Sequence, residues 1–122
     1  MDFILKIIIL LLREYEVNIP IHRVSKLNEQ GYDITGTKSN LIVKMCEAVK
    51  AKNFIFGILG RDYMDKQTFV DNNINYYFQN FEHPKYNQKH GEFVSNMSSI
   101  DLLFNHGKDS IKILGKSSGD IE

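Results

Sequence analysis

The order of hydrophobic and polar residues in the middle of the chain predicts alternating strands and helices. Between residues 37 and 52 the apolar positions are three or four apart, as on one face of a helix: Leu41, Ile42, Met45, Cys46 and Val49. Apolar, β-rich runs at residues 53–57 and 73–79 predict strands, and residues 65–72 predict a second helix. Another strand is expected within Val17–Val24, starting at or just after Pro20. This order is typical of a parallel sheet with right-handed crossovers.

The chain begins with an apolar run from Phe3 to Leu12 that is interrupted only by Lys6. This run has three interpretations: a core helix, a secretory signal, and a membrane anchor or interfacial helix. The run is about half the length that a bilayer-spanning helix needs. It also lacks the preceding positive charge and the following small residues of a signal peptide. These criteria favour a core helix that spans residues 1–16. A helix that is apolar nearly all round must be covered on several sides, so we expect self-association or a complementary chain.

The pattern changes after residue 79. Residues 80–94 are polar and aromatic without periodicity, which predicts a long ordered loop. Ser98 is the predicted N-cap of a helix that ends before Gly107, with Asp101 positioned to accept from the first backbone amides. A last short helix is expected at residues 108–114, followed by a flexible tail at 115–122.

Composition limits the fold and the function classes. The 122 residues are 43% hydrophobic and 25% charged, which is average for one globular domain with one core. Fifteen acidic and fifteen basic residues balance, so no electrostatic preference for nucleic acid is expected. The single cysteine, Cys46, excludes an internal disulfide and fits a reducing, cytoplasmic compartment. We expect an α/β fold, a small three-layer or two-layer Rossmann-like partial domain with a short, mainly parallel sheet.

The first candidate site is a glycine-containing turn after the strand at 53–57. Its residues are Gly57, Gly60, Arg61, Asp62 and Tyr63, in a predicted loop that leads into the next helix. Glycines at the carboxyl end of a parallel strand let a ligand approach the backbone, and Arg61 could bind a phosphate or carboxylate. The alternative is a tight turn with a surface pair between Arg61 and Asp62.

The second candidate site lies in the long loop and contains His83, Tyr86 and Gln88, with Glu82 and His90 nearby. Histidine titrates near neutral pH, so this group could transfer protons. Zinc is disfavoured because the two histidines are seven apart in an irregular loop and only Glu82 could be a third ligand. The alternative is an aromatic loop packed over the sheet with solvated histidines.

The third candidate site is the face of the predicted helix formed by Ser98, Asp101 and Asn105, which could bind sugar or ribose hydroxyls. Helix capping explains Ser98 and Asp101 equally well. Cys46 lies on the apolar face of its own helix and is expected in the core.

The order and spacing of these motifs resemble the C-terminal half of the WbqC-like family. The matching pattern is Gly57-x-x-Gly-Arg-Asp-Tyr63, Phe81-x-His-Pro-x-Tyr86-x-Gln88, Glu92-Phe93 and Ser98-x-x-Asp-Leu-Leu-Phe-Asn-x-Gly107. The resemblance covers residues 17–114. The N-terminal motifs of the family do not occur in the sequence, so residues 1–16 are expected to correspond to the inside of a family helix.

The resemblance implies a role in bacterial surface-polysaccharide (O-antigen) biosynthesis, with acyl or aminoacyl transfer to a nucleotide-linked amino sugar. It implies catalytic roles for His83, Tyr86 and Asp101. It implies ligand binding by a larger set: Gly57, Gly60, Arg61, Asp62, Tyr63, Gln88 and Asn105. The expected partners are a nucleotide-sugar or an activated acyl donor, and no cofactor is assigned. The alternative is a truncated, non-catalytic remnant, or half of a split protein that needs a partner chain.

Overall fold

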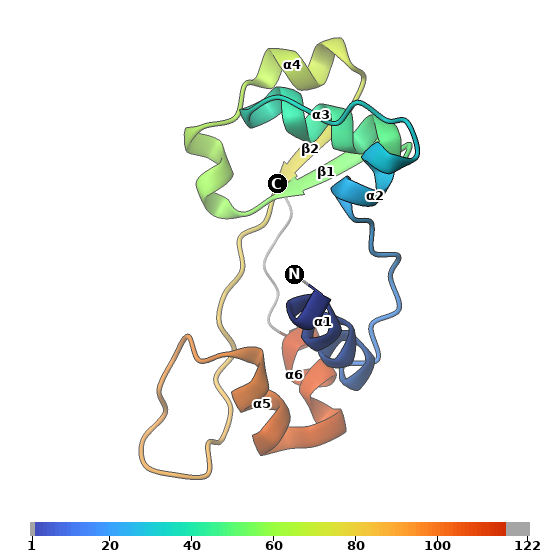
Figure 1. The fold of residues 1–122 in the computed structure, drawn as a ribbon. Coiled ribbons are helices and arrows are strands. Elements are labelled where there is room, and N and C mark those ends of the chain that lie inside the picture. Colours follow the sequence, from blue (N-terminus) through green and yellow to red (C-terminus); the bar gives the residue numbers. More distant parts are fainter. Residues whose placement is uncertain (1, 117–122) are drawn as a thin grey trace. The chain divides into compact units, whose positions relative to one another are not determined.

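The computed structural model describes residues 2–116, which form two compact units (Figure 1). The first unit is built from the segment up to Pro20 and the segment from Phe81 onward. The second unit is the continuous segment Ile21–Asn80. Each unit has its own apolar cluster, whereas the length of the chain predicts one core.

The second unit is a small α/β structure. It contains α2 (Val24–Glu29), α3 (Lys38–Ala48), β1 (Asn53–Phe56), the 3-10 helix η1 (Ile58–Asp62), α4 (Lys66–Asp71) and β2 (Asn75–Phe78). Strands β1 and β2 pair in parallel, with Asn53 beside Asn75 and Phe56 beside Phe78. The predicted α/β fold with a short parallel sheet is therefore confirmed.

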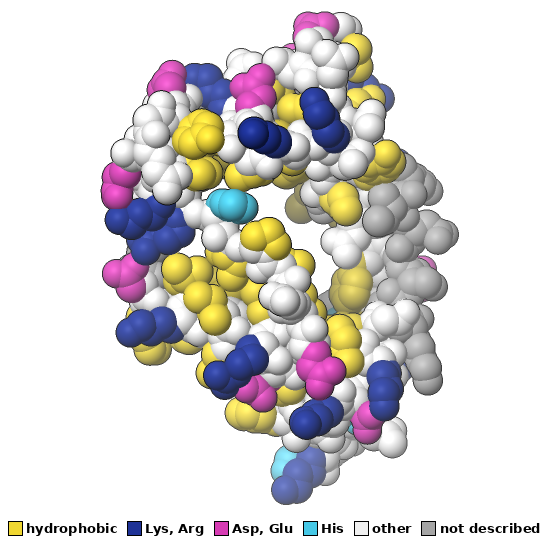
Figure 2. Space-filling model, turned by 90° about the vertical axis from the view of Figure 1, so that its right-hand side faces the viewer, with side chains coloured by type: hydrophobic (Ala, Val, Ile, Leu, Met, Phe, Trp, Pro, Cys, Tyr) yellow, Lys and Arg dark blue, Asp and Glu magenta, His cyan; other side chains and the backbone are white. Residues whose placement is uncertain are grey.

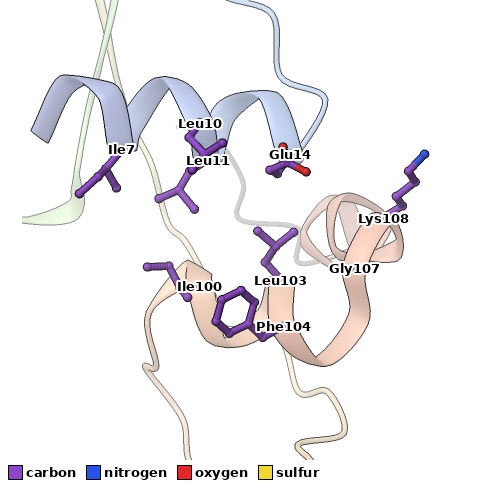
Figure 3. A pocket seen from close by; sticks show the side chains of 9 residues that line it. All are labelled: Ile7, Leu10, Leu11, Glu14, Ile100, Leu103, Phe104, Gly107 and Lys108. Atoms are coloured by element: carbon purple, nitrogen blue, oxygen red, sulfur yellow. The ribbon is translucent and has the colours of Figure 1, made fainter. Parts of the chain in front are cut away.

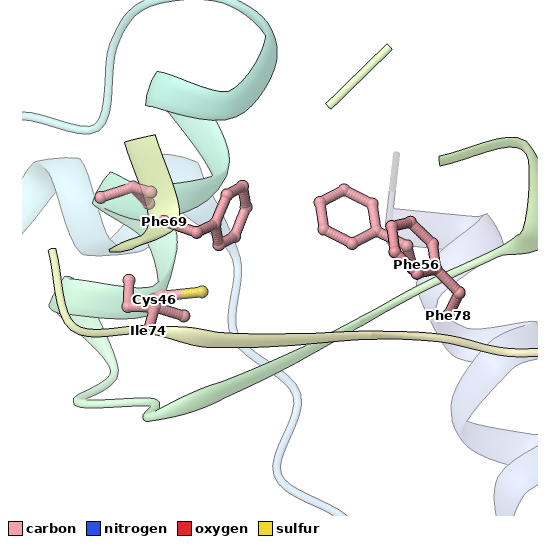
Figure 4. Packing of buried hydrophobic residues seen from close by; sticks show 6 residues of the cluster. Cys46, Phe56, Phe69, Ile74 and Phe78 are labelled. Atoms are coloured by element: carbon pink, nitrogen blue, oxygen red, sulfur yellow. The ribbon is translucent and has the colours of Figure 1, made fainter. Parts of the chain in front are cut away.

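The core of the second unit lies between the sheet and the helices α3 and α4 (Figure 4). Phe56 and Phe78 stack at 5.6 Å between ring centroids, and Phe69 of α4 lies edge-on to Phe56 at 5.3 Å. Cys46 is buried in this cluster, as expected. Ile55 precedes Phe56 on β1, so its side chain points to the opposite face of the sheet, and it is 52% exposed. Within the unit, the helices thus cover one face of the sheet and leave two layers.

Two local predictions for this part of the chain are wrong. No strand forms within residues 17–24, and Val24 instead begins α2. A strand requires a neighbour for its backbone hydrogen bonds, and β-rich composition does not supply one. Residues 58–62 form the 3-10 helix η1 where a loop was expected, with the Gly60 amide donating to the Gly57 carbonyl at 2.8 Å.

The first unit is helical. It contains α1 (Asp2–Glu14), α5 (Ser99–His106), the 3-10 helix η2 (Gly107–Asp109) and α6 (Ser110–Lys116), with an irregular segment at residues 81–98. The Ser98 hydroxyl accepts from the Ile100 amide at 3.3 Å, and Gly107 ends α5 with φ +53°, so both predicted ends are confirmed. Residues 115 and 116 belong to α6 rather than to a tail, and the rest of the predicted tail lies outside the described residues.

The apolar helix at the start of the chain forms, but none of its residues is buried. One side of α1 lies against α5 and α6, where Leu11 lines a cavity with Leu103, and Leu12 lines another with Ile111. The buried centre of the unit consists of Tyr15, Tyr86 and Leu102. The expectation of a core helix is therefore wrong, since a unit of this size offers too little cover. None of the described helices is long and apolar enough to cross a membrane.

Figure 2 shows one face of the molecule, on which basic and acidic side chains lie interspersed with hydrophobic ones. This mixture agrees with the balanced charge of the sequence. Among the described side chains in this view, no large region carries charges of one sign only.

Candidate functional site

The predicted site residues fall into two groups, one in each compact unit. The turn that joins β1 to η1 carries Gly57, Gly60, Arg61, Asp62 and Tyr63 in the second unit. The loop at residues 80–98 and helix α5 carry the other group in the first unit: His83, Tyr86, Gln88, Asp101 and Asn105.

The two glycines of the β1–η1 turn differ in their surroundings. A Cβ atom on Gly60 would lie 2.6 Å from the Phe56 Cβ, so only glycine lets η1 fold back over β1. Gly57 has φ −67°, and nothing lies within 4 Å of the Cβ position that a side chain would occupy. Packing therefore explains Gly60 but leaves Gly57 facing open space, where a ligand could approach the backbone.

Arg61 and Tyr63 surround the same turn. The Arg61 guanidinium carbon lies 5.0 Å from the centroid of the Phe78 ring, within cation–π range. Tyr63 is 55% exposed, and its ring is edge-on to Phe56 at 6.3 Å. The Asp62 carboxylate makes no ion pair within the described part of the chain, so the alternative of a surface pair between Arg61 and Asp62 is not seen.

In the first unit, the Asp101 carboxylate joins three of the predicted site residues. Its Oδ2 accepts from the Tyr86 hydroxyl at 2.7 Å and from Gln88 Nε2 at 3.1 Å. Its Oδ1 accepts from Asn105 Nδ2 at 3.2 Å. The sequence predicted that Asp101 accepts from the first backbone amides of α5. Its two oxygens instead accept from these three side chains.

Gln88 and Asn105 extend this network to the backbone of the loop. The Gln88 side chain bridges to Val94, donating to its carbonyl at 2.9 Å and accepting from its amide at 2.8 Å. Asn105 Oδ1 accepts from the Lys89 amide at 2.8 Å. These bonds tie the loop to α5, so the predicted ligand-binding residues Gln88 and Asn105 have a structural role in this unit.

His83 lies among aromatic rings in the same loop. The ring centroids of Phe81, Tyr86 and Phe93 lie 6.0–6.4 Å from that of His83. Nδ1 of His83 is 2.9 Å from the Pro84 carbonyl oxygen, which can only accept a hydrogen bond, so Nδ1 must carry the proton. In the neutral ring, Nε2 then holds the lone pair and can act as a base.

Burial raises the pKa of the Tyr86 phenol, and its hydrogen bond to Asp101 raises that pKa further. The phenol is therefore a proton donor at neutral pH and not a phenolate. Tyr15, whose hydroxyl donates to the Ser99 carbonyl, also has a raised pKa because of burial. Across residues 2–116, no three His, Cys, Asp or Glu side chains gather in a way that could hold a metal ion.

Sequence patterns alone did not identify two further contributors to this region. His106 lies edge-on to Tyr86 at 5.6 Å between ring centroids, with Nε2 2.9 Å from the Asn87 carbonyl oxygen. Tyr15 reaches the start of α5 from a segment 84 residues earlier in the chain. His106 follows Asn105 directly on α5, which is a usable signal, whereas nothing in the sequence links Tyr15 to Ser99.

Comparison with known proteins identifies the family. The WbqC-like protein family matches residues 1–113, so the match includes α1 as well as the motifs from Gly57 to Gly107. The resemblance is therefore not confined to the residues after 16, as the motifs alone had indicated. The uncharacterized protein Rv1507c of Mycobacterium tuberculosis is 26% identical over 84 residues, which make up 68% of this chain and 36% of that protein. This chain thus spans about a third of the length of that relative. No solved structure matches significantly. The chain belongs to the WbqC-like protein family.

Proposed function

We propose that the chain takes part in bacterial surface-polysaccharide (O-antigen) biosynthesis in the cytoplasm, by acyl or aminoacyl transfer to a nucleotide-linked amino sugar. Family membership supports the biosynthetic role. The observation that carries the chemistry is the 2.9 Å contact between His83 Nδ1 and the Pro84 carbonyl oxygen, which favours the tautomer with the proton on Nδ1 and leaves Nε2 as the basic nitrogen.

Acyl transfer to an amine needs a proton acceptor. The amine nitrogen attacks the carbonyl carbon of the activated acyl donor, the new C–N bond forms, and the bond to the leaving group breaks. The nitrogen must lose a proton, and His83 Nε2 can take it and pass it to the leaving group. Imidazole suits this role because its ordinary pKa lies near neutrality.

Tyr86 and Asp101 act as positioning residues in this proposal. Their mutual hydrogen bond holds the loop, and the Tyr86 ring lies 6.0 Å from that of His83 between centroids. Gln88 and Asn105 brace the same loop through Asp101. The network holds the loop that carries His83, and we expect this to limit the orientations of the imidazole, as general base catalysis requires.

The β1–η1 turn is the proposed site for the phosphates of the nucleotide. Gly57 leaves room for a phosphate next to the backbone. The Arg61 guanidinium carbon lies over the Phe78 ring at 5.0 Å from its centroid, and its N–H groups are the atoms that would bind phosphate. The exposed ring of Tyr63 could stack on a base.

Binding of nucleotides and nucleotide-sugars to wild type and Arg61→Ala tests the phosphate site. Loss of a charge-assisted hydrogen bond should weaken binding by about 1.5–3 kcal/mol, or roughly ten- to a hundredfold. Lys66→Ala is the matched control, because Lys66 is an exposed cation of the same unit. If Arg61→Ala binds every tested ligand as tightly as wild type, Arg61 is only a turn residue.

The chemical role of His83 is tested separately. Thiol release from an acyl thioester, in the presence of a nucleotide-linked amino sugar, should fall by at least about a hundredfold in His83→Asn. His90→Asn removes an exposed imidazole from the same loop and should keep full activity. Equal rates in the two variants would exclude His83 as the base.

A second candidate function is a non-catalytic module, or half of a protein that needs a partner chain. The observation in its favour is that both Asp101 oxygens are engaged by Tyr86, Gln88 and Asn105, which accounts for these residues without a substrate. A well-folded chain that binds none of the tested nucleotides or nucleotide-sugars would favour this candidate.

A further inference from the structure

An apolar groove separates α1 from α5 in the first unit (Figure 3). Its volume is about 460 Å³, which lies within the range of small-molecule sites. Helix α1 contributes Ile7, Leu10 and Leu11, and α5 contributes Ile100, Leu103 and Phe104. These side chains offer water no hydrogen-bond partner, so an apolar ligand that enters the groove displaces only weakly held water.

The polar groups of the groove lie at one end. Glu14, Gly107 and Lys108 line that end, whereas Ile7 lies at the other (Figure 3). The Glu14 carboxylate is already paired with the Arg13 guanidinium at 2.8 Å. Lys108 makes no ion pair or hydrogen bond with any residue that the structure describes. Because Glu14 already has a partner, the Lys108 ammonium is the lining charge that a ligand can pair with, which favours an anionic group at this end.

The length of the groove can be taken from α1. Ile7 and Glu14 are seven residues apart, which corresponds to about 10 Å along a helix. An extended alkyl chain advances about 1.25 Å per carbon, given its bond length, so about eight to ten carbons reach from one end to the other.

We propose that this groove binds an aliphatic chain of about eight to ten carbons with an anionic headgroup, the chain lying between α1 and α5 and the headgroup at Lys108. The charged end favours an amphiphile over an occupant that offers only apolar side chains, such as the Ile7–Leu12 part of α1 in a second copy. The proposal goes beyond the proposed function and does not depend on it, because it requires only binding.

The test uses the whole chain and a series of ligands, followed by backbone amide NMR and calorimetry. Affinity should rise about fourfold per methylene from hexanoate to decanoate and then level off. Octanol and octylamine have the same eight-carbon alkyl chain as octanoate and should bind more weakly than octanoate. Lys108→Gln should bring octanoate to the affinity of octanol, whereas Lys85→Gln, which changes an exposed lysine outside the groove, should not.

Two variants address the groove itself. Ile100→Trp fills the groove and should abolish binding. Phe104→Ser removes a lining ring that is 84% exposed, so it should weaken binding without unfolding the unit. The proposal is overturned if octanoate shifts no amide of α1 or α5, or if Ile100→Trp binds as well as wild type. It is also overturned if light scattering finds a dimer that Ile100→Trp dissociates and octanoate does not.

Discussion

The hydrogen bond between Tyr86 and Asp101 should hold the long loop on α5, and Tyr86→Phe removes the hydroxyl that donates this bond. The variant keeps the ring, which lies 5.5 Å from Phe93 and 5.6 Å from His106 between centroids. Tyr86 is 9% exposed, so water cannot readily replace the lost hydroxyl. A net hydrogen bond to a charged group contributes about 1.5–3 kcal/mol. We expect a loss at the lower end, about 1.5 kcal/mol, because Gln88 and Asn105 still donate to Asp101.

Hydrogen exchange of the α5 amides is the suitable assay, since it reports the opening of the first unit alone. A loss of about 1.5 kcal/mol corresponds to roughly tenfold faster exchange. Tyr32→Phe is the matched control, because Tyr32 is exposed in the second unit and should change nothing.

A double-mutant cycle with Asp101→Asn isolates the contact. The coupling energy between the two positions should be at least about 1 kcal/mol if the pair acts as one unit. Additive effects, or a Tyr86→Phe variant that exchanges no faster than Tyr32→Phe, would show that the hydroxyl does not hold the loop.

Three other predictions concern stability and association. Gly60→Ala should destabilise the second unit by about 1–3 kcal/mol in urea unfolding because its Cβ would meet Phe56, whereas Gly57→Ala, with open space at that position, should be nearly neutral. The exposed apolar surface of α1 should make the chain self-associate at micromolar concentration, which light scattering can measure, and a monomer that binds no hydrophobic dye would contradict this. The raised pKa values of Tyr15 and Tyr86 mean that the folded chain holds these protons more tightly than the unfolded chain. The contribution of these two phenols to stability should therefore be unchanged between neutral pH and about pH 10 and should fall above it, as measured by thermal unfolding.

Periodicity and capping predicted the elements that depend on neighbouring residues. Helix α3, both parallel strands and helix α5 with its Ser98 cap follow from spacing and residue type. The strand expected near Pro20 failed because strand formation depends on a partner, which local sequence does not specify.

In the candidate site, too, features set by neighbouring residues were predicted and features set by long-range contacts were not. The motif spacing grouped Asp101 with Asn105 on one helix face, and the structure confirms that they contact each other. It could not show that Tyr86 and Gln88 would occupy the Asp101 carboxylate, because the path of an irregular loop is set by long-range contacts. Nor could it show that the two groups of candidate residues lie in different compact units.

The division of the chain also has a consequence for the order of folding. The second unit is one continuous segment, while the first unit needs the chain before Pro20 to meet the chain after Phe81. The second unit can therefore form as soon as its residues leave the ribosome, and α1 must wait for α5 and α6. Folding of the second unit also replaces about 60 flexible residues between the two parts of the first unit with an ordered connection, which changes the entropic cost of bringing these parts together. Until then α1 is an exposed apolar segment, which makes it the expected contact for a chaperone during synthesis.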